Sequence, residues 1–221
     1  MDVTEAVAER RSVRAFADAP VDLELIGRLV VQAARAPSGG NLQPWHVDLI
    51  AGETIARLKT TMADKLARGE LEAAEYDIYP RELGDLYKGR RFQVGEDMYA
   101  RLGIPREDKE ARRRWFANNF QFFGAPAALF VTVDRRMGPP QWSDLGMFLQ
   151  TFMLLAVEAR LATCPQECWA MFPATVKAIL GTPPERLLFC GVAIGVPCDR
   201  SAVNTLRAAR APAAEWLAIH P

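Results

Sequence analysis

The spacing of apolar residues predicts a chain in which helices and strands alternate. Residues 22–35 show the clearest helical period, because Leu23, Ile26 and Leu29 fall on one face after Asp22, a residue type that caps helices. The same period predicts two further helices, over residues 2–10 and 53–68.

Continuous apolar runs predict the strands, over residues 45–50, 127–133 and 187–194. The last two runs have the composition of strands that are covered on both faces. Between them, the apolar positions of residues 143–160 nearly encircle a helix, so this helix is expected to be buried on most sides. It is either a central core helix or half of a dimer interface. The pattern as a whole predicts an α+β or α/β chain with one central sheet.

Composition adds limits to this picture. With 221 residues, 50% of them hydrophobic and 24% charged, the chain fits one large domain over residues 1–221. Lys+Arg and Asp+Glu both number 27, so no overall charge favours nucleic acid or an anionic membrane, and any anion site must be local. We find neither an apolar run of about 20 residues nor a signal-peptide pattern, and therefore expect a cytoplasmic protein.

Metal and cysteine chemistry are not expected. The four cysteines, Cys164, Cys168, Cys190 and Cys198, form no Cys-x-x-Cys pair, and the chain has only two histidines. Cys190 lies in an apolar run, where a free cysteine is usually a small core residue. No histidine is placed to suggest a base for a cysteine nucleophile.

A loop at residues 34–46 has the composition of a ligand-binding segment. Prolines and glycines hold its backbone in non-repeating conformations, while Ser38, Asn41 and Gln43 offer hydroxyl and amide groups to a flat polar heterocycle. An ordinary connection between a helix and a strand has the same composition.

An arginine-rich segment near the N-terminus suggests a phosphate site. Arg10, Ser12 and Arg14 share one side of an extended chain, and Arg11 and Val13 share the other. Guanidinium groups bind phosphate oxygens through two hydrogen bonds, and a serine hydroxyl adds a neutral donor. Taken alone, the segment is equally consistent with a solvated run of charge.

Together the two segments resemble the nitroreductase-like family of FMN-dependent oxidoreductases. The matching motifs are Arg-x-Ser-x-Arg at residues 10–14 and Pro-Ser-x-x-Asn-x-Gln-Pro-Trp at residues 37–45. Four further segments resemble the nitrobenzoate-reductase-like branch, at residues 122–126, 142–146, 164–167 and 202–212. The resemblance therefore covers most of the chain.

The resemblance implies a nitroreductase-like fold, in which helices flank a central mixed, mainly antiparallel sheet. It implies a homodimer with FMN at the subunit interface, and a backbone N–H, that of Glu167, directed at flavin N5. No catalytic side chain is assigned with certainty, and the cofactor supplies the redox chemistry. The residues expected to contact FMN are Arg10, Arg11, Ser12, Arg14, Pro37, Ser38, Gly39, Asn41, Gln43, Asp144, Pro165, Gln166, Glu167, Arg207 and Arg210.

Two variable regions are expected to complete the site. Residues 69–106 carry all four tyrosines and match a mobile family insertion that covers the flavin, although a surface excursion with one or two helices fits the same composition. Within it, Arg90 or Arg91 supplies a charge near the flavin. Residues 197–221 match an arm that wraps the partner subunit.

The expected activity is reduction of nitroaromatic, quinone or activated-alkene acceptors by NADH or NADPH in a ping-pong reaction. Two alternatives within the fold are a reductive dehalogenase and an enzyme that cleaves the flavin itself. The dehalogenase-like relatives use a Glu, Tyr and Lys set, for which this chain offers Glu72, Tyr76 and Lys88 without matching spacing. A flavin-binding or storage protein without turnover is an alternative from another class.

Overall fold

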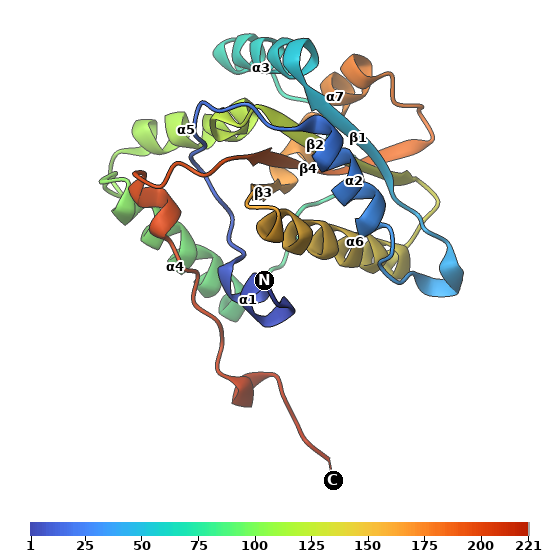
Figure 1. Ribbon diagram of the computed structural model, residues 1–221. Helices are drawn as coiled ribbons and strands as arrows, with labels where there is room; N and C mark the ends of the chain where they lie inside the picture. The colour runs from blue at the N-terminus through green and yellow to red at the C-terminus, as the bar shows by residue number, and fades with distance from the viewer. Residues whose placement is uncertain (221) are drawn as a thin grey trace.

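A four-stranded antiparallel sheet forms the centre of the computed structural model, which describes residues 1–220 (Figure 1). Its strands are β1 (His46–Ala51), β2 (Ala127–Asp134), β3 (Ala162–Gln166) and β4 (Arg186–Gly195). They lie in the order β1-β2-β4-β3, and each neighbouring pair is antiparallel. The parallel component expected of a mixed sheet is limited to one isolated bridge, between Ser12 and Thr163.

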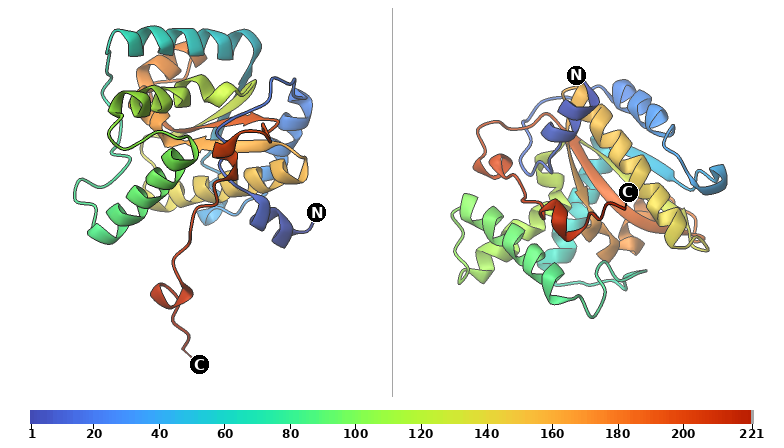
Figure 2. Two further views of the ribbon diagram at one scale, coloured as in Figure 1. Left: turned by 90° about the vertical axis from the view of Figure 1, so that its left-hand side faces the viewer. Right: turned by 90° about the horizontal axis from the view of Figure 1, so that it is seen from below.

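Helices cover both faces of the sheet (Figures 1 and 2). One face carries α2 (Leu23–Ala33) and α6 (Pro139–Glu158), with α1 (Val3–Glu9) packed on α6. The other face carries α3 (Gly52–Ala67) and α7 (Pro173–Leu180). Helices α4 (Asp85–Arg101) and α5 (Lys109–Ala117) lie away from β1, beyond the opposite side of the sheet. Five short 3-10 helices are η1 (Gly39–Asn41), η2 (Asn118–Gly124), η3 (Glu167–Met171), η4 (Ala202–Thr205) and η5 (Ala213–Glu215).

Alternation along the two inner strands divides the core into two clusters. In β2, Leu129 and Val131 pack with α2 and α6, whereas Ala128 and Phe130 pack toward α3 and η2. Strand β4 divides its side chains in the same way. Burial on both faces explains why these strands are apolar without interruption, as the sequence predicted.

The predicted elements are confirmed, with shifted ends. Asp22 caps α2 as expected and accepts the backbone N–H groups of Glu24 and Leu25 at 2.9 and 3.0 Å. Helix α6 begins at Pro139, four residues before the predicted start, because its prolines occupy the first turn, where no intrahelical N–H bond is needed. Its exposed strip is narrow and includes Met147 and Gln150. The sequence analysis did not predict β3, α5 or α7.

The cluster beneath η2 is aromatic and closely packed. Trp169 is fully buried, stacks on Phe122 at 4.8 Å between ring centroids and meets Phe130 edge-on at 5.2 Å. Phe122 and Phe123 both have left-handed backbone conformations, with φ of 51° and 53°. Such conformations are costly for aromatic residues, so the packing of this cluster must hold them in place.

A β-bulge interrupts the pairing of β2 with β4. Val131 pairs with Cys190 and Thr132 with Leu188, so that Phe189 has no partner opposite it. The extra residue releases backbone groups of β4 from the ladder. These groups are used by another segment, as described below.

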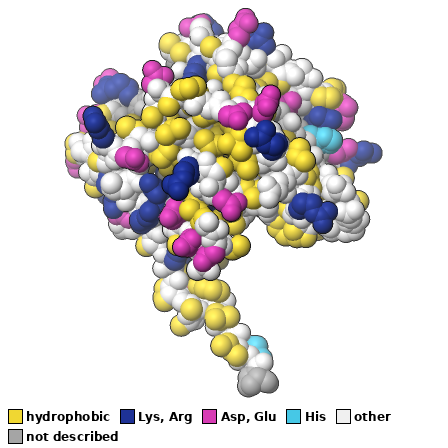
Figure 3. All heavy atoms as spheres, in the orientation of Figure 1, with side chains coloured by type: hydrophobic (Ala, Val, Ile, Leu, Met, Phe, Trp, Pro, Cys, Tyr) yellow, Lys and Arg dark blue, Asp and Glu magenta, His cyan; other side chains and the backbone are white. Residues whose placement is uncertain are grey.

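The C-terminal residues leave the body of the molecule. Beyond η4 the chain extends away from the sheet and ends far from it (Figure 1). Apolar side chains line this tail (Figure 3), and Trp216 is 70% exposed. Within residues 1–220, no helix is long and apolar enough to cross a membrane.

Gly191 generates a stability prediction. A Cβ at this position would lie 2.5 Å from Trp169 Cδ1 and 3.1 Å from Phe130 Cε1. We expect Gly191→Ala to lower the free energy of unfolding by about 1–3 kcal/mol, because the buried rings have no space to move. The control is Gly27→Ala in α2, where no atom lies within 4 Å. This change should be neutral or stabilising by up to about 1 kcal/mol. Equal urea midpoints for the two variants would contradict the packing argument.

Candidate functional site

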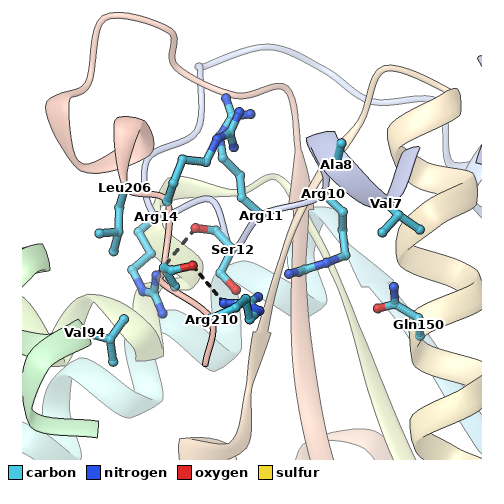
Figure 4. A pocket seen from close by; sticks show the side chains of 12 residues that line it. Val7, Ala8, Arg10, Arg11, Ser12, Arg14, Val94, Gln150, Leu206 and Arg210 are labelled. Atoms are coloured by element: carbon cyan, nitrogen blue, oxygen red, sulfur yellow. Dashed lines mark hydrogen bonds between the residues drawn. The ribbon is translucent and has the colours of Figure 1, made fainter. Parts of the chain in front are cut away.

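Arginines from two distant segments line one cavity of about 630 Å³. Figure 4 shows Arg10 and Arg14, which follow α1, together with Arg210 from the C-terminal segment. Ser12 and Gln150 also contribute to the lining. The sequence-predicted residues in this cavity are Arg10, Arg11, Ser12, Arg14, Arg207 and Arg210.

Backbone hydrogen bonds hold the arginine segment against β3. The Val13 N–H donates to the Thr163 carbonyl at 2.9 Å, and Val13 itself is buried. The predicted alternation therefore holds for Val13. Arg11 departs from it, because it borders both the arginine cavity and a smaller one on the other side of the segment.

Asn204 joins the two arginine-bearing segments. Its side-chain oxygen accepts the Arg14 N–H at 2.9 Å, and its amide nitrogen donates to the carbonyls of Ala15 and Cys198 at 2.8 and 3.0 Å. This amide is 5% exposed. Asn204 lies within the family-like segment at residues 202–212 but is not among the residues predicted to form the site. An amide between Val203 and Thr205 was the available signal.

The cavity is strongly cationic. Among residues 1–220, no carboxylate lies within 4.0 Å of the guanidinium groups of Arg10, Arg11, Arg14, Arg207 or Arg210. Burial, followed by the charge of Arg210, lowers the pKa of Arg10. A multiply charged anion would relieve this repulsion and find several donors at once.

A second cavity has a volume of about 560 Å³. Arg14 lines both cavities, so the two are neighbours. The second cavity is mainly aromatic and apolar, with walls from the segment before α4, from α4 and from α5. Its wall residues are Ile78, Tyr79, Arg91, Met98, Tyr99, Trp115, Phe116, Asn119, Phe123, Cys168 and Met171.

The end of β3 and the start of η3 complete the second cavity, through Pro165, Gln166 and Glu167. The Gln166 side chain is buried and donates to the Asn119 carbonyl at 2.6 Å, so its amide serves to fix this turn. Glu167 is the first residue of η3, and its N–H has no acceptor within that helix. Burial raises the pKa of the Glu167 carboxyl group and of the Cys168 thiol.

Residues 70–79, here called the strap, connect the body of the molecule to the second cavity. The Glu72 carboxylate accepts the backbone N–H groups of Ala174 and Thr175 at 2.8 and 3.1 Å. It thereby caps α7, whose own N-cap residue, Phe172, makes no side-chain cap bond. Lys65 approaches the same carboxylate at 3.3 Å.

The strap also attaches to the bulge in β4. Glu75 accepts the Leu188 N–H at 3.2 Å and pairs with Arg135 at 2.6 Å and with Lys177 at 3.2 Å. The hydroxyl group of Tyr76 donates to the Phe189 carbonyl. The first part of residues 69–106, the segment expected to cover the flavin, is therefore bonded to the sheet and to α7.

Arg90 and Arg91, the two candidates for a charge near the flavin, have different surroundings. Tyr79 reaches the second cavity, and the guanidinium of Arg91 lies 4.2 Å from its ring centroid. Arg90 instead pairs with Glu215 of the C-terminal tail at 2.5 Å. Of the two, Arg91 is the one that faces the cavity.

The predicted ligand loop lies outside the arginine cavity and the second cavity. Ser38 Oγ accepts the Gln43 N–H at 3.0 Å, which orders the loop internally. Asp144 is 3% exposed and accepts the Gly39 N–H at 3.3 Å, so in this chain it anchors the loop. The predicted site residues grouped here, away from the arginines, are Pro37, Ser38, Gly39, Asn41, Gln43 and Asp144.

Comparison with known proteins adds a family to this geometry. The sequence model described as the Nitroreductase family matches residues 7–196. The chain is 35% identical over 209 residues to a 4-nitrobenzoate reductase of Pseudomonas putida, with 95% of this chain and 91% of the relative covered. It superposes with a TM-score of 0.97, at 48% identity and full coverage of both chains, on the crystal structure of an FMN and NADPH-dependent nitroreductase NfnB from Sphigopyxis sp. strain HMH. The TM-score is 0.93, at 28% identity and full coverage of both, for an FMN-dependent nitroreductase NfnB from Mycobacterium smegmatis in complex with NADPH.

The strap generates a pH prediction. Burial raises the pKa of Glu75, but its bonds to Arg135, Leu188 and Lys177 outweigh burial, and the net pKa lies below the ordinary value of 4.5. Its stabilisation is therefore present above about pH 4.5 and is lost as the pH falls through the lowered pKa. We expect Glu75→Gln to lower the free energy of unfolding at pH 7 by about 1–3 kcal/mol.

Urea unfolding of the wild type and of Glu75→Gln, at pH 7 and in acid, measures the difference between their free energies of unfolding. This difference should be smaller in acid. Glu70→Gln is the matched control, since Glu70 lies on the same strap but is 40% exposed and pairs only with Lys65 and Arg68. A loss that does not vary with pH would show that the charge of Glu75 is not the cause.

Proposed function

Because the chain belongs to the nitroreductase family, we propose that it binds FMN and uses NADPH to reduce nitroaromatic compounds, with quinones and activated alkenes as further acceptors. One observation carries this proposal: a cationic cavity and an aromatic one lie on either side of Arg14, which lines both. FMN has the matching polarity, with a phosphate at one end and a flat ring system at the other. Both NfnB relatives are described as FMN-dependent, one as NADPH-dependent and the other in complex with NADPH, which supports the same two cofactors for this chain.

The residues of both cavities fit this cofactor. Arg10, Arg14 and Arg210 would hold the phosphate together with Ser12, because guanidinium and hydroxyl donors face one cavity without a carboxylate partner. Arg11 and Arg207 add charge to the same cavity. The ring system would lie toward Pro165, Gln166 and Glu167, where the first N–H of η3 is free to donate.

Bound in this site, FMN would supply the two-electron redox chemistry between the nicotinamide and the acceptor. The chain contributes position and environment to this chemistry. Tyr99, Trp115 and Phe123 provide apolar walls that exclude water and contact flat ligands. The Glu167 N–H would donate toward flavin N5, as the family resemblance implies. One cavity serving both donor and acceptor fits a ping-pong sequence.

A second copy of the chain would complete the site. The loop at residues 37–43 is ordered but remote from the arginines, so we propose that it contacts FMN held mainly by a partner subunit. Apolar residues suited to an interface are exposed on α1 and α6, including Val3, Val7 and Met147. Of the predicted arm at residues 197–221, the part up to Arg210 lines the arginine cavity of its own chain, so the exposed residues 211–220 are the part that would wrap the partner.

The strap argues against the dehalogenase alternative. Glu72 is engaged with α7 and Tyr76 with the Phe189 carbonyl, while Lys88 pairs with Asp85 at 3.4 Å. These three side chains therefore do not converge on a ligand. A flavin-binding protein without turnover is separated from an enzyme by the experiment that follows.

The test is a flavin titration in the absence of oxygen. We expect the purified protein to retain FMN, to lose its yellow colour on addition of NADPH and to regain it with nitrobenzene. Arg14→Ala should weaken FMN retention more than tenfold, since a charge-assisted contact contributes about 1.5–3 kcal/mol. Arg28→Ala is the control, because Arg28 is exposed on α2 and pairs only with Asp22 and Glu24.

Three results would count against parts of the proposal. A protein that stays colourless with added FMN would exclude the cofactor. Failure of the bound flavin to bleach with either NADPH or NADH would favour the storage protein. Unchanged retention by Arg14→Ala would remove Arg14 from the phosphate site.

The arm gives a separate prediction about assembly. Trp216→Ala should weaken the dimer by about 2 kcal/mol, roughly thirtyfold in dissociation constant, because an aromatic anchor buried on a partner is a typical hot spot. Sedimentation equilibrium measures the change. Leu71→Ala is the control, since Leu71 is an apolar side chain on the strap and is 83% exposed. A wild-type monomer at all concentrations would refute the dimer.

A further inference from the structure

Two neighbouring arginines on α4 have different surroundings. Arg90 is bound to Glu215 of the tail at 2.5 Å, so its charge is already compensated. Among residues 1–220, no carboxylate lies within 4.0 Å of the Arg91 guanidinium. Glu96, one turn further along the same helix, is held by Arg112 at 3.0 Å. Arg91 therefore brings an uncompensated charge to the second cavity.

The guanidinium of Arg91 lies over an aromatic ring. It lies 4.2 Å from the ring centroid of Tyr79, a distance at which the π face attracts a cation. Tyr79 belongs to the strap, which Glu72 and Glu75 attach to α7 and β4. A contact with a ring face uses none of the N–H donors of the guanidinium, and among residues 1–220 these donors make no hydrogen bond to another side chain or to the backbone, so they can serve a ligand.

The remaining charges in this cavity do not cancel Arg91. Arg14 is the other cation in the lining, and it also lines the phosphate cavity. Glu167 is the one acidic residue among the lining side chains, and burial favours its neutral form. The rest of the lining is neutral, with tyrosine, tryptophan and phenylalanine rings and two methionines. A flat ligand that carries a negative group at one end matches this distribution.

We propose that Arg91 is a specificity-determining residue that selects acceptors bearing an anionic group, with aromatic carboxylates as the substrate class. The inference rests on the proposed function, because it concerns the acceptor of the same site. The ring of such an acceptor would contact the aromatic walls, and its carboxylate would accept hydrogen bonds from Arg91. A phosphate of NADPH carries the same charge, so the test separates the two sources.

The experiment compares two acceptors of nearly the same shape with the FMN-loaded enzyme. These are 4-nitrobenzoate, which is anionic, and 4-nitrobenzamide, which is neutral. For Arg91→Gln we expect kcat/KM with 4-nitrobenzoate to fall roughly tenfold, mainly through KM, and kcat/KM with the amide to stay unchanged. Lys88→Gln is the matched control, with the same charge change on the same helix and no expected effect, because Lys88 is exposed and pairs with Asp85 at 3.4 Å. Arg91→Lys should restore part of the preference.

The half-reactions identify the source of the anion. Stopped-flow reduction of the bound flavin by NADPH should proceed equally in wild type and Arg91→Gln. A selective loss in this half-reaction would reassign Arg91 to the nucleotide and overturn the proposal. Equal losses with both acceptors would also overturn it, by showing a role in cavity shape. If the wild-type enzyme reduces neither acceptor, the proposed function fails together with this inference. Reduction of both without discrimination defeats the inference alone.

Discussion

Strand β4 is the element on which the site depends, because it lies between β2 and β3 and is hydrogen-bonded to both. Through β3 it places Pro165 to Glu167, and through β3 it also aligns the arginine segment. At Gly191 it allows Trp169 to approach, and at the Phe189 bulge it receives the strap. A shift of one residue in β4 would reverse its side chains and misplace all these attachments together.

The arginine cavity places an electrostatic cost on the protein without its ligand. Burial, and then the charge of Arg210, lowers the pKa of Arg10, and neither guanidinium has a carboxylate partner within the part of the chain that the structure describes. Buried charge of one sign reduces stability unless a counter-ion is present. A bound phosphate would therefore add to folding stability in addition to positioning the cofactor. Hydrogen bonds between uncharged groups, among them those of the Asn204 side chain, hold the arginine-bearing segments together and offset part of this cost.

Local signals predicted the helices and the two inner strands well, because their apolar period reflects burial on the faces of one sheet. Strand β3 was missed because it is five residues long, contains a proline and reads as a loop. The arginine cluster could be predicted from spacing and family resemblance. The roles of Asn204, Glu72 and Glu75 could not, since each depends on residues about 100 or more positions away. Which of Arg90 and Arg91 faces the cavity likewise depends on the rotation of α4 against the strap.

That rotation has an evolutionary consequence. Successive residues of an α-helix point about 100° apart, so Arg90 and Arg91 sample two directions from nearly the same height on α4. With the end of α4 held by the bond from Arg101 to Thr205 of η4, deletion of one residue between Arg91 and Arg101 would turn the preceding part of the helix by about 100° and place Arg90 where Arg91 now lies. Lineages that vary in the length of this helix can thus change the surroundings of the charge presented to a substrate without a substitution in the rest of the cavity wall.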